Sequence, residues 1–242
     1  MIKTIVCFVY IVFTMIILVP FGLITVLFSL LGFRKHMSVF MYRIAQGWAL
    51  LLIAIIGCKL TVSGRENIPR KGSVCFVSNH GSIADILMIL AHAGRPIGFI
   101  AKKELLKIPF LNMWIFVLGG HFIDRGNPRK ALKTINAGVE RIKAGISMII
   151  FPEGHRSRNQ GLLPFRPGAL RLATQSEAII VPIALAGTYD IFEKNSRAYA
   201  GHVKVTFCSP INTADIAVSD RKQVLSDQIY GIIQEALKKQ EI

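Results

Sequence analysis

The sequence has few cysteines, and they do not form pairs. Its four cysteines lie far apart in apolar surroundings, with no C-x-x-C spacing. This excludes a disulfide framework or a structural zinc site as the organising feature and fits a reducing compartment. No Asn-x-Ser/Thr glycosylation sequence occurs either, which agrees with the cytoplasmic side of a cell. The cysteines are Cys7, Cys58, Cys75 and Cys208.

Acidic residues are also scarce. There are 14 Asp and Glu against 29 Lys and Arg, for a formal net charge of +15. Only 18% of the residues are charged and 52% are hydrophobic, with a mean hydropathy of +0.49. This composition excludes a mainly disordered chain and provides more apolar material than a soluble domain usually buries, so we expect part of it to contact lipid. The basic residues lack the interleaved aromatic side chains of single-strand binders, so we expect no nucleic-acid partner.

Several common catalytic signatures are missing. The chain has no Gly-rich dinucleotide fingerprint, no P-loop, no HExxH and no GxSxG. Four of the six histidines show no metal-ligand spacing and are interpreted as structural or solvated. We therefore expect no metal ion and no resident cofactor. These four histidines are His36, His92, His121 and His202.

Two long uncharged runs open the chain. The first lies between Lys3 and Arg34, and the second covers residues 44–58. About 20 apolar residues cross a bilayer, so the first run is long enough to span, with a bend at Pro20, and the second is better suited to an interfacial helix. The expectation is a two-helix membrane anchor over residues 1–58. The alternative is that one or both runs are core helices of a soluble protein.

A basic linker is expected between these two helices. Arg34, Lys35 and Arg43 lie between the apolar runs and should stay at the lipid headgroups, because a charge is costly in the bilayer centre. The positive-inside tendency then predicts a membrane location with this linker on the cytoplasmic face, which in a bacterium is the inner (plasma) membrane.

From residue 59 to 242 the pattern predicts one α/β domain. Short β-branched runs alternate with helical segments, and two of the runs are hydrophobic throughout, as in strands buried on both faces of a largely parallel sheet. We expect a largely parallel central sheet flanked by helices. The expected strands cover 59–64, 73–79, 97–102, 121–125, 147–153, 178–187 and 202–209, and the expected helices cover 82–93, 112–118, 128–144, 167–176 and 219–239.

The segment NHGSIAD, residues 79–85, carries the clearest catalytic signal. It follows a predicted strand and opens a predicted helix, which places His80 at the carboxyl end of a strand, where open α/β sheets hold their sites. Asp85, one turn into the helix, can reach back to orient the imidazole. This is a general base without its own nucleophile, so the nucleophile would be a hydroxyl of the substrate. The alternative is that Asn79 or Ser82 caps the helix and His80 is an ordinary loop histidine.

Two further strand ends carry basic loops. In HFIDRGNPRKA, residues 121–131, Arg125 and the start of a helix can hold a phosphate together. In FPEGHRSRNQGLLPFRPGA, residues 151–169, three arginines follow a strand. A solvated charge cluster is the alternative for the first loop. A basic face resting on anionic lipid is the alternative for the second, and it is compatible with phosphate binding.

The order of these motifs resembles a known family. NHGSIAD, AKKELLKIP, FIDR, FPEGHRSR with LLPFRPGA, and IVPIALAG are similar to the glycerolipid acyltransferases with the HxxxxD motif, and most of all to the lysophosphatidate (1-acyl-sn-glycerol-3-phosphate) acyltransferases. The resemblance runs from about residue 60 to 188, and an apolar amino-terminal helix pair is also typical of the family. It implies transfer of an acyl chain from acyl-CoA or acyl-acyl carrier protein, as co-substrate, to the sn-2 hydroxyl of lysophosphatidate, which gives phosphatidate.

The resemblance also implies roles for individual residues. His80 would be the general base with Asp85 as its partner, and Arg125 and Arg156 would bind the phosphate of the acceptor. Glu153 and Gly154 would shape the second basic loop. Lys102 or Lys103 would add a phosphate contact, and the sequence does not choose between them. Val181, Pro182 and Ile183 match an apolar block that forms site wall or core. The chain departs from the family at His155, where the family usually has Thr.

The sequence leaves other functions open. The acceptor can be another lysophospholipid or glycerol 3-phosphate, because basic residues indicate a phosphate without saying which molecule carries it. From a different class, the chain can be a non-catalytic basic membrane adaptor. The sequence argues against an adaptor, because an adaptor would not need His80 and Asp85 beside two basic loops.

Overall fold

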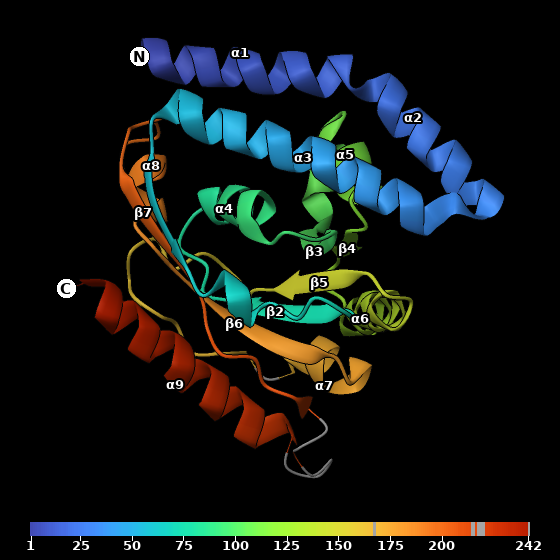
Figure 1. Cartoon of the computed structure of the whole chain (residues 1–242), viewed down its shortest axis with the longest axis vertical. Coiled ribbons are helices and arrows are strands. Elements are labelled where there is room, and N and C mark those ends of the chain that lie inside the picture. The colour runs from blue at the N-terminus through green and yellow to red at the C-terminus, as the bar shows by residue number, and fades with distance from the viewer. Residues whose placement is uncertain (167, 214–215, 217–220, 242) are drawn as a thin grey trace.

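The computed structural model of the protein describes residues 1–166, 168–213, 216 and 221–241. Within them a single sheet of seven strands runs through the middle of the molecule (Figure 1). All seven lie where the sequence predicted a strand. They are β1 Lys59–Ser63, β2 Val74–Ser78, β3 Ile97–Lys102, β4 His121–Ile123, β5 Ser147–Ile150, β6 Ile179–Ala186 and β7 His202–Phe207.

The sheet is largely parallel, as the sequence predicted. Its strand order is β1-β7-β6-β2-β5-β3-β4, and only the β6–β7 pair is antiparallel. Every residue of β2 and β5 is buried, because helices cover both faces of the sheet. The central strand β2 pairs in parallel with both β5 and β6, so the carboxyl ends of these three strands meet at one edge. Open α/β sheets place their sites at such an edge.

The helices form a layer on each face of the sheet (Figure 1). On one face, α3 and α4 contribute to an apolar core with the strands, and on the other α6, α7 and α9 form a second core. The helices are α1 Ile2–Ile17, α2 Val19–Phe28, α3 Arg34–Ile56, α4 Ala84–His92, α5 Leu111–Val117, α6 Pro128–Lys143, α7 Arg171–Ser176, α8 Thr188–Ile191 and α9 Arg221–Glu241.

The predicted helices of the α/β domain agree with α4, α5, α6, α7 and α9, with ends that differ by a few residues. The predicted starts at Pro167 and Ser219 lie outside the described residues. The short helix α8, which follows β6 after Gly187, was not predicted. Its four residues are too few to show a helical period.

The first apolar run is a bent helix pair. A break at Leu18 separates α1 from α2, and Pro20 lies in the first turn of α2, where proline has no N–H that the helix needs. The two parts meet at 42°. The bend expected at Pro20 is therefore present, two residues before the proline itself.

The basic linker that we expected between the apolar helices is wrong. Arg34, Lys35 and Arg43 all belong to α3, which begins at Arg34 and continues for 23 residues. The chain turns earlier, where Gly32 adopts a φ of 94°. The reversal needs a left-handed backbone, which glycine supplies, and the helix then runs through the charged positions because Arg and Lys are good helix formers.

Helix α3 lies against the α/β domain. The Tyr42 hydroxyl donates to the carbonyl oxygen of Leu90 at 3.2 Å, and Gln46 Nε2 donates to that of Ala91 at 2.9 Å. In α1 the Thr14 hydroxyl accepts the indole N–H of Trp48 from α3 at 2.8 Å. Among the described helices, residues 36–56 alone are long and apolar enough to cross a membrane by themselves, and the bent pair qualifies when its parts are taken together.

Candidate active site

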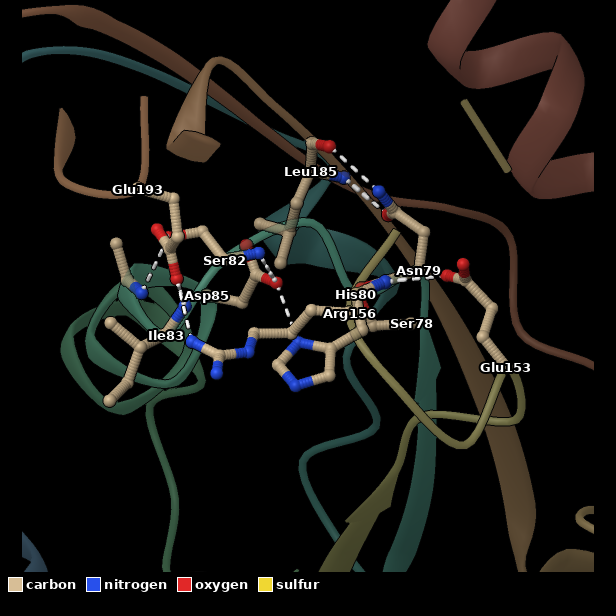
Figure 2. Close-up of polar contacts among 11 residues, drawn as sticks. Ser78, Asn79, His80, Ser82, Ile83, Asp85, Glu153, Arg156, Leu185 and Glu193 are labelled. Carbon is tan, nitrogen blue, oxygen red and sulfur yellow. Dashed lines mark hydrogen bonds and ion pairs between the residues drawn. The ribbon is translucent and has the colours of Figure 1, made fainter. Parts of the chain in front are cut away.

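The loop that follows β2 is attached to the neighbouring strand β6. The side chain of Asn79 donates from Nδ2 to the carbonyl oxygen of Leu185 at 2.9 Å and accepts the N–H of Leu185 at 2.8 Å (Figure 2). Asn79 is buried, so both bonds are shielded from water. The position of His80, the next residue, is thereby tied to the sheet.

His80 and Asp85 form a close pair. Asp85 lies in the first turn of α4 and is fully buried, and its Oδ2 is 2.8 Å from His80 Nδ1. The same oxygen accepts the N–H of Ser82 at 2.9 Å. Because an ionised carboxylate only accepts, the proton belongs on Nδ1, which leaves Nε2 as the nitrogen able to take a proton. The pair predicted from NHGSIAD is thus within hydrogen-bonding distance.

The imidazole of His80 is held on one side by an aromatic ring. It stacks on Phe151 with 4.1 Å between ring centroids, and the side chain is 17% exposed. The other carboxylate oxygen of its partner, Asp85 Oδ1, is buried and has no hydrogen-bond partner among the described residues. The charge of Asp85 is therefore available to stabilise a protonated imidazole.

Glu153 supports the backbone of His80. It is buried in the loop after β5, and its Oε1 accepts the N–H of His80 at 2.6 Å while Oε2 accepts the N–H of Leu163 at 3.1 Å. Burial raises the pKa of Glu153, and the two N–H donors partly oppose this. The N–H of Ser157 donates to the carbonyl oxygen of His80 at 2.7 Å. The loop after β5 thus holds both backbone polar groups of the histidine.

Gly154 allows the same loop to turn beside Arg166. Its φ is 76°, and a Cβ there would lie 2.5 Å from Arg166 Nε, so a larger residue would be both strained and crowded. The neighbouring His155, the departure from the family pattern, has Nδ1 3.3 Å from Arg166 Nη2. Arg166 Nε also donates to the carbonyl oxygen of Glu153 at 3.2 Å. His155 therefore contacts a basic residue of the same loop rather than the His80–Asp85 pair.

Arg156 pairs with a residue that the sequence did not single out. Its Nη1 lies 2.8 Å from Oε1 of Glu193, which follows α8 (Figure 2). Glu193 also accepts the N–H of Ile83 at 2.7 Å and the hydroxyl of Ser82. The carboxylate therefore joins the loops after β2, β5 and β6.

A large cavity opens beside this cluster. It has a volume of about 2450 Å³, and His80 lies in its wall. Basic side chains line the same cavity, which concentrates positive charge near the histidine. The pKa of Arg125 is lowered by its partial burial and by the neighbouring positive charge of Arg166. These basic residues are Lys102, Arg125, Arg156, Arg158, Arg166 and Arg171.

The two candidate lysines differ in their surroundings. Lys102 is in the cavity wall, and its Nζ forms a longer, exposed ion pair of 3.4 Å with Oε1 of Glu104. Lys103 is not among the lining residues, and its Nζ forms an ion pair of 2.8 Å with Oδ1 of Asp124. Hydrogen bonding to Lys103 lowers the pKa of Asp124 and raises that of the lysine, although both groups are open to solvent. The geometry therefore favours Lys102 as the lysine that faces a ligand in the cavity.

Another part of the cavity lining is apolar. Side chains of α1, α3, α4 and α5 form its walls, so a long hydrocarbon chain would be shielded from water there. The lining includes Ile11, Trp48, Leu87, Trp114 and Leu118. The residues of the predicted apolar block, Val181 and Ile183, are buried strand residues of the core, and Pro182 stands between them in β6.

No group of three or more potential metal ligands occurs among the residues that the structure describes. The described site contains a histidine with its carboxylate partner, a set of basic side chains and an apolar lining. This combination can activate a hydroxyl group next to an anionic headgroup.

Comparison with known proteins gives the family. The family model Acyltransferase matches residues 59–186, which is more than half of the chain. The chain belongs to the acyltransferase family. The match includes His80, Asp85 and both basic loops up to the end of β6.

Named relatives of this acyltransferase include plant and bacterial enzymes. It is 36% identical over 168 residues to a 1-acyl-sn-glycerol-3-phosphate acyltransferase of Cocos nucifera, and the alignment covers 68% of this chain and 54% of the other. It is 34% identical over 141 residues to the Borreliella burgdorferi enzyme of that name, an alignment that covers 58% of this chain and 56% of the other. It is 32% identical over 196 residues to the Salmonella typhimurium enzyme, with 81% of this chain and 77% of the other covered. The chain spans about half the length of the first two.

A solved structure shares the fold of this acyltransferase. The 1-acyl-sn-glycerophosphate acyltransferase from Thermotoga maritima superimposes with a TM-score of 0.79 at 23% identity. The superposition covers 99% of this chain and 97% of the other, so the amino-terminal helices are included in it as well as the sheet.

Some residues of the acyltransferase site were missed by sequence reasoning. Asn79 was considered only as a helix cap, and Ser82 likewise, whereas Glu193 was not considered. The first two stand inside NHGSIAD and could have been noticed there. Glu193 lies more than a hundred residues further on, in a segment without a motif, and only the sheet order brings it to the site.

Proposed function

We propose that this protein transfers an acyl chain from acyl-CoA or acyl-acyl carrier protein to the sn-2 hydroxyl of lysophosphatidate, producing phosphatidate for phospholipid synthesis. The observation that carries the proposal is the position of the His80–Asp85 pair at a cavity whose lining contains both basic and many apolar side chains. The names of the relatives support the same acceptor.

His80 acts as the general base. Nε2 takes the proton of the acceptor hydroxyl while the hydroxyl oxygen attacks the thioester carbonyl carbon. The C–S bond then breaks, and the departing sulfur receives the proton from the imidazolium, giving a free thiol and the new ester. A positioned base contributes about 10²- to 10⁴-fold, or about 3 to 5.5 kcal/mol of barrier. Asp85 holds the imidazole in the required tautomer and stabilises its protonated form.

Basic side chains bind the phosphate of the acceptor. A phosphate monoester carries close to two negative charges at neutral pH, and planar guanidinium groups match its oxygens in pairs. Arg125 and Arg156 line the cavity beside His80, and Lys102 adds a third cation. Holding the headgroup there brings the neighbouring hydroxyl within reach of Nε2 and lowers the entropy cost of the reaction.

The amino-terminal helices keep the enzyme at the membrane that contains its substrate and product. Many apolar side chains of α1 and α2 are exposed, among them Phe8, Phe13 and Leu23. Each CH₂ group kept in lipid is worth about 0.8 kcal/mol, so an acceptor that stays near the bilayer avoids the cost of full extraction. The basic residues Arg34, Lys35 and Arg43 of α3 support placement on the cytoplasmic face. The division into an anchor, residues 1–58, and a catalytic domain, residues 59–242, is part of the proposal.

An assay with the detergent-solubilised full chain tests the function. Lysophosphatidate is mixed with acyl-CoA or with acyl-acyl carrier protein, and thiol release and lipid product are followed together. We expect phosphatidate with the wild type and none with His80→Ala, which should still sediment with membranes. Phosphatidate formation by His80→Ala would remove the base assignment. Activity only with glycerol 3-phosphate or other lysophospholipids would replace the acceptor, and inactivity with every acceptor would favour an adaptor.

A second variant tests the phosphate role. Arg156→Ala should raise the KM for lysophosphatidate at least about tenfold, since it removes a charge-assisted bond, and should leave the KM for the thioester nearly unchanged. An equal rise in both KM values would contradict a specific contact with the acceptor.

A further inference from the structure

Glu193 is a largely buried carboxylate that belongs to no motif. It is 11% exposed, and it accepts hydrogen bonds from Ser82, Ile83 and Arg156. Ser82 and Ile83 precede α4, Arg156 follows β5, and Glu193 follows β6, so one carboxylate receives donors from two other loops (Figure 2). These loops stand side by side because β6, β2 and β5 are adjacent in the sheet.

Glu193 is held in place mainly by α4. The hydroxyl of Ser82 accepts the N–H of Ala84, the first residue of this helix, at 2.9 Å, and the N–H of Ile83, the residue before it, donates to Glu193 Oε1 at 2.7 Å. A carboxylate at a helix amino terminus is favoured by the unpaired N–H groups and by the helix dipole. The anchorage of Glu193 at the start of α4 therefore does not depend on Arg156, whereas the guanidinium has no other hydrogen-bond partner among the described residues.

The contact leaves most of the guanidinium free. Arginine has five N–H donors in a planar fork, and Glu193 takes one of them, at Nη1. The Arg156 side chain is 37% exposed and lines the cavity beside His80. A phosphate can therefore bind the remaining donors without displacing the carboxylate. The long arginine side chain is already ordered before the ligand arrives, so less freedom is lost on binding.

We propose that Glu193 is the positioning residue for Arg156, fixing the guanidinium at the acceptor end of the cavity. The inference rests on the proposed function, in which Arg156 binds the phosphate of the acceptor, and deepens it by naming the group that orients this arginine. Glu193 does not touch the reacting atoms. It acts through Arg156, and its influence should therefore disappear when Arg156 is removed.

Steady-state kinetics of the detergent-solubilised full chain test the proposal. Glu193→Ala should raise the KM for lysophosphatidate about tenfold while the KM for acyl-CoA changes less than about twofold. Glu193→Gln should remain within about threefold of the wild type, because one amide oxygen can still accept from Ile83 and Arg156. If Glu193→Gln raised the KM for lysophosphatidate as much as Glu193→Ala does, the orienting role would be overturned. Such a result would mean that the negative charge of Glu193 itself is required.

A double-mutant cycle separates positioning from general support of the fold. If Glu193 acts through Arg156, the variant with both Glu193→Ala and Arg156→Ala should have the same KM for lysophosphatidate as Arg156→Ala alone. Additive effects on that KM would overturn the proposal. The control is Asp190→Ala, an exposed carboxylate three residues earlier that pairs with Lys194 at 3.0 Å and should leave both KM values unchanged.

A further variant of Glu193 and the separate effect of Arg156→Ala complete the test. If Glu193→Ala does not fold, Glu193→Asp replaces it, since the shorter side chain keeps the charge but withdraws from Arg156, and it should raise the acceptor KM in the same way. An acceptor KM that Arg156→Ala does not change would defeat the phosphate role of the proposed function. An effect of Arg156→Ala without any effect of Glu193→Ala or Glu193→Asp would defeat only the inference about Glu193.

Discussion

The side chain of Asn79 continues the β2–β6 ladder beyond the last paired residues of the strands. Backbone pairing of the two strands ends with Ser78 opposite Ile183, and the Asn79 amide then makes both of its bonds to the backbone of Leu185, at 2.8 and 2.9 Å. An amide side chain can do this because it carries a donor and an acceptor side by side, like a peptide group. The strand thus ends in a fixed place directly before His80.

Replacing Asn79 should destabilise the protein. Asn79→Ala leaves the buried N–H and carbonyl oxygen of Leu185 without partners, at a cost of about 2 to 4 kcal/mol in the free energy of unfolding. Chemical unfolding of the detergent-solubilised protein measures this. Asn79→Asp places a buried carboxylate oxygen against the carbonyl oxygen of Leu185, so it should be at least as destabilising as the Ala variant. Equal stability of all three would show that the two bonds do not support the loop.

The charge of Asp85 should matter for the rate rather than for binding. Asp85→Asn keeps an oxygen for His80 and Ser82 but no longer stabilises a protonated imidazole, so kcat should fall by about 10²-fold or more, within the range of a positioned base. The KM for lysophosphatidate should change little. Initial rates at several acceptor concentrations separate the two parameters, with Asp190→Asn as the matched surface control. A normal kcat for Asp85→Asn would contradict its role as the partner of His80.

The two neighbouring lysines should behave differently. Lys102→Ala removes a cation from the cavity wall and should raise the KM for lysophosphatidate roughly fivefold, as expected for an exposed charge-assisted contact. Lys103→Ala removes the partner of Asp124 and should leave that KM unchanged. The KM for lysophosphatidate is measured for both variants under the same conditions. A rise with Lys103→Ala and none with Lys102→Ala would assign the contact to Lys103.

Glu153 should give the stability a defined pH dependence. Burial places its pKa in the folded protein above the ordinary value, so the folded state binds the proton more tightly than the unfolded chain does. The contribution of this carboxyl group to stability is then full below the ordinary pKa and is lost as the pH rises through the raised one. Glu153→Gln cannot titrate and should lack this loss.

Unfolding of both proteins between about pH 4 and pH 7 tests this sign, because the difference between wild type and variant cancels the other titrating groups. We expect the stability of the wild type relative to Glu153→Gln to decrease as the pH rises. An increase would mean that the N–H groups of His80 and Leu163 stabilise the carboxylate by more than burial costs it.

The strands and the His80–Asp85 pair were accessible from the sequence because their signals are local. Strands β5 and β6 stand out in the sequence as near-continuous apolar runs, and five residues separate the histidine from its partner on one strand-to-helix turn. A hydrophobic period or a short motif reports such features directly. The same holds for the bend at Leu18, where Pro20 is its visible cause.

The remaining features depend on distant parts of the chain. The start of α3 at Arg34 was missed because charges were taken to end a membrane helix, whereas the turn is made by Gly32. The choice between Lys102 and Lys103 needed the position of Asp124, and Glu193 reaches the site only because β6 lies beside β2. Single residues far apart in the chain carry no periodic signal that could reveal such contacts.

The central place of β2 in the sheet has a consequence for synthesis of the chain. Both partners of Val74–Ser78 come later: β5 begins at Ser147 and β6 at Ile179. Until those segments leave the ribosome, the apolar strand VCFVS has neither of its neighbours and exposes two open edges, which makes the nascent chain prone to association. The strand that leads into His80 therefore stays unpaired until β5 is made, and a product truncated before β6 would contain the complete NHGSIAD sequence without the Leu185 backbone to which Asn79 binds.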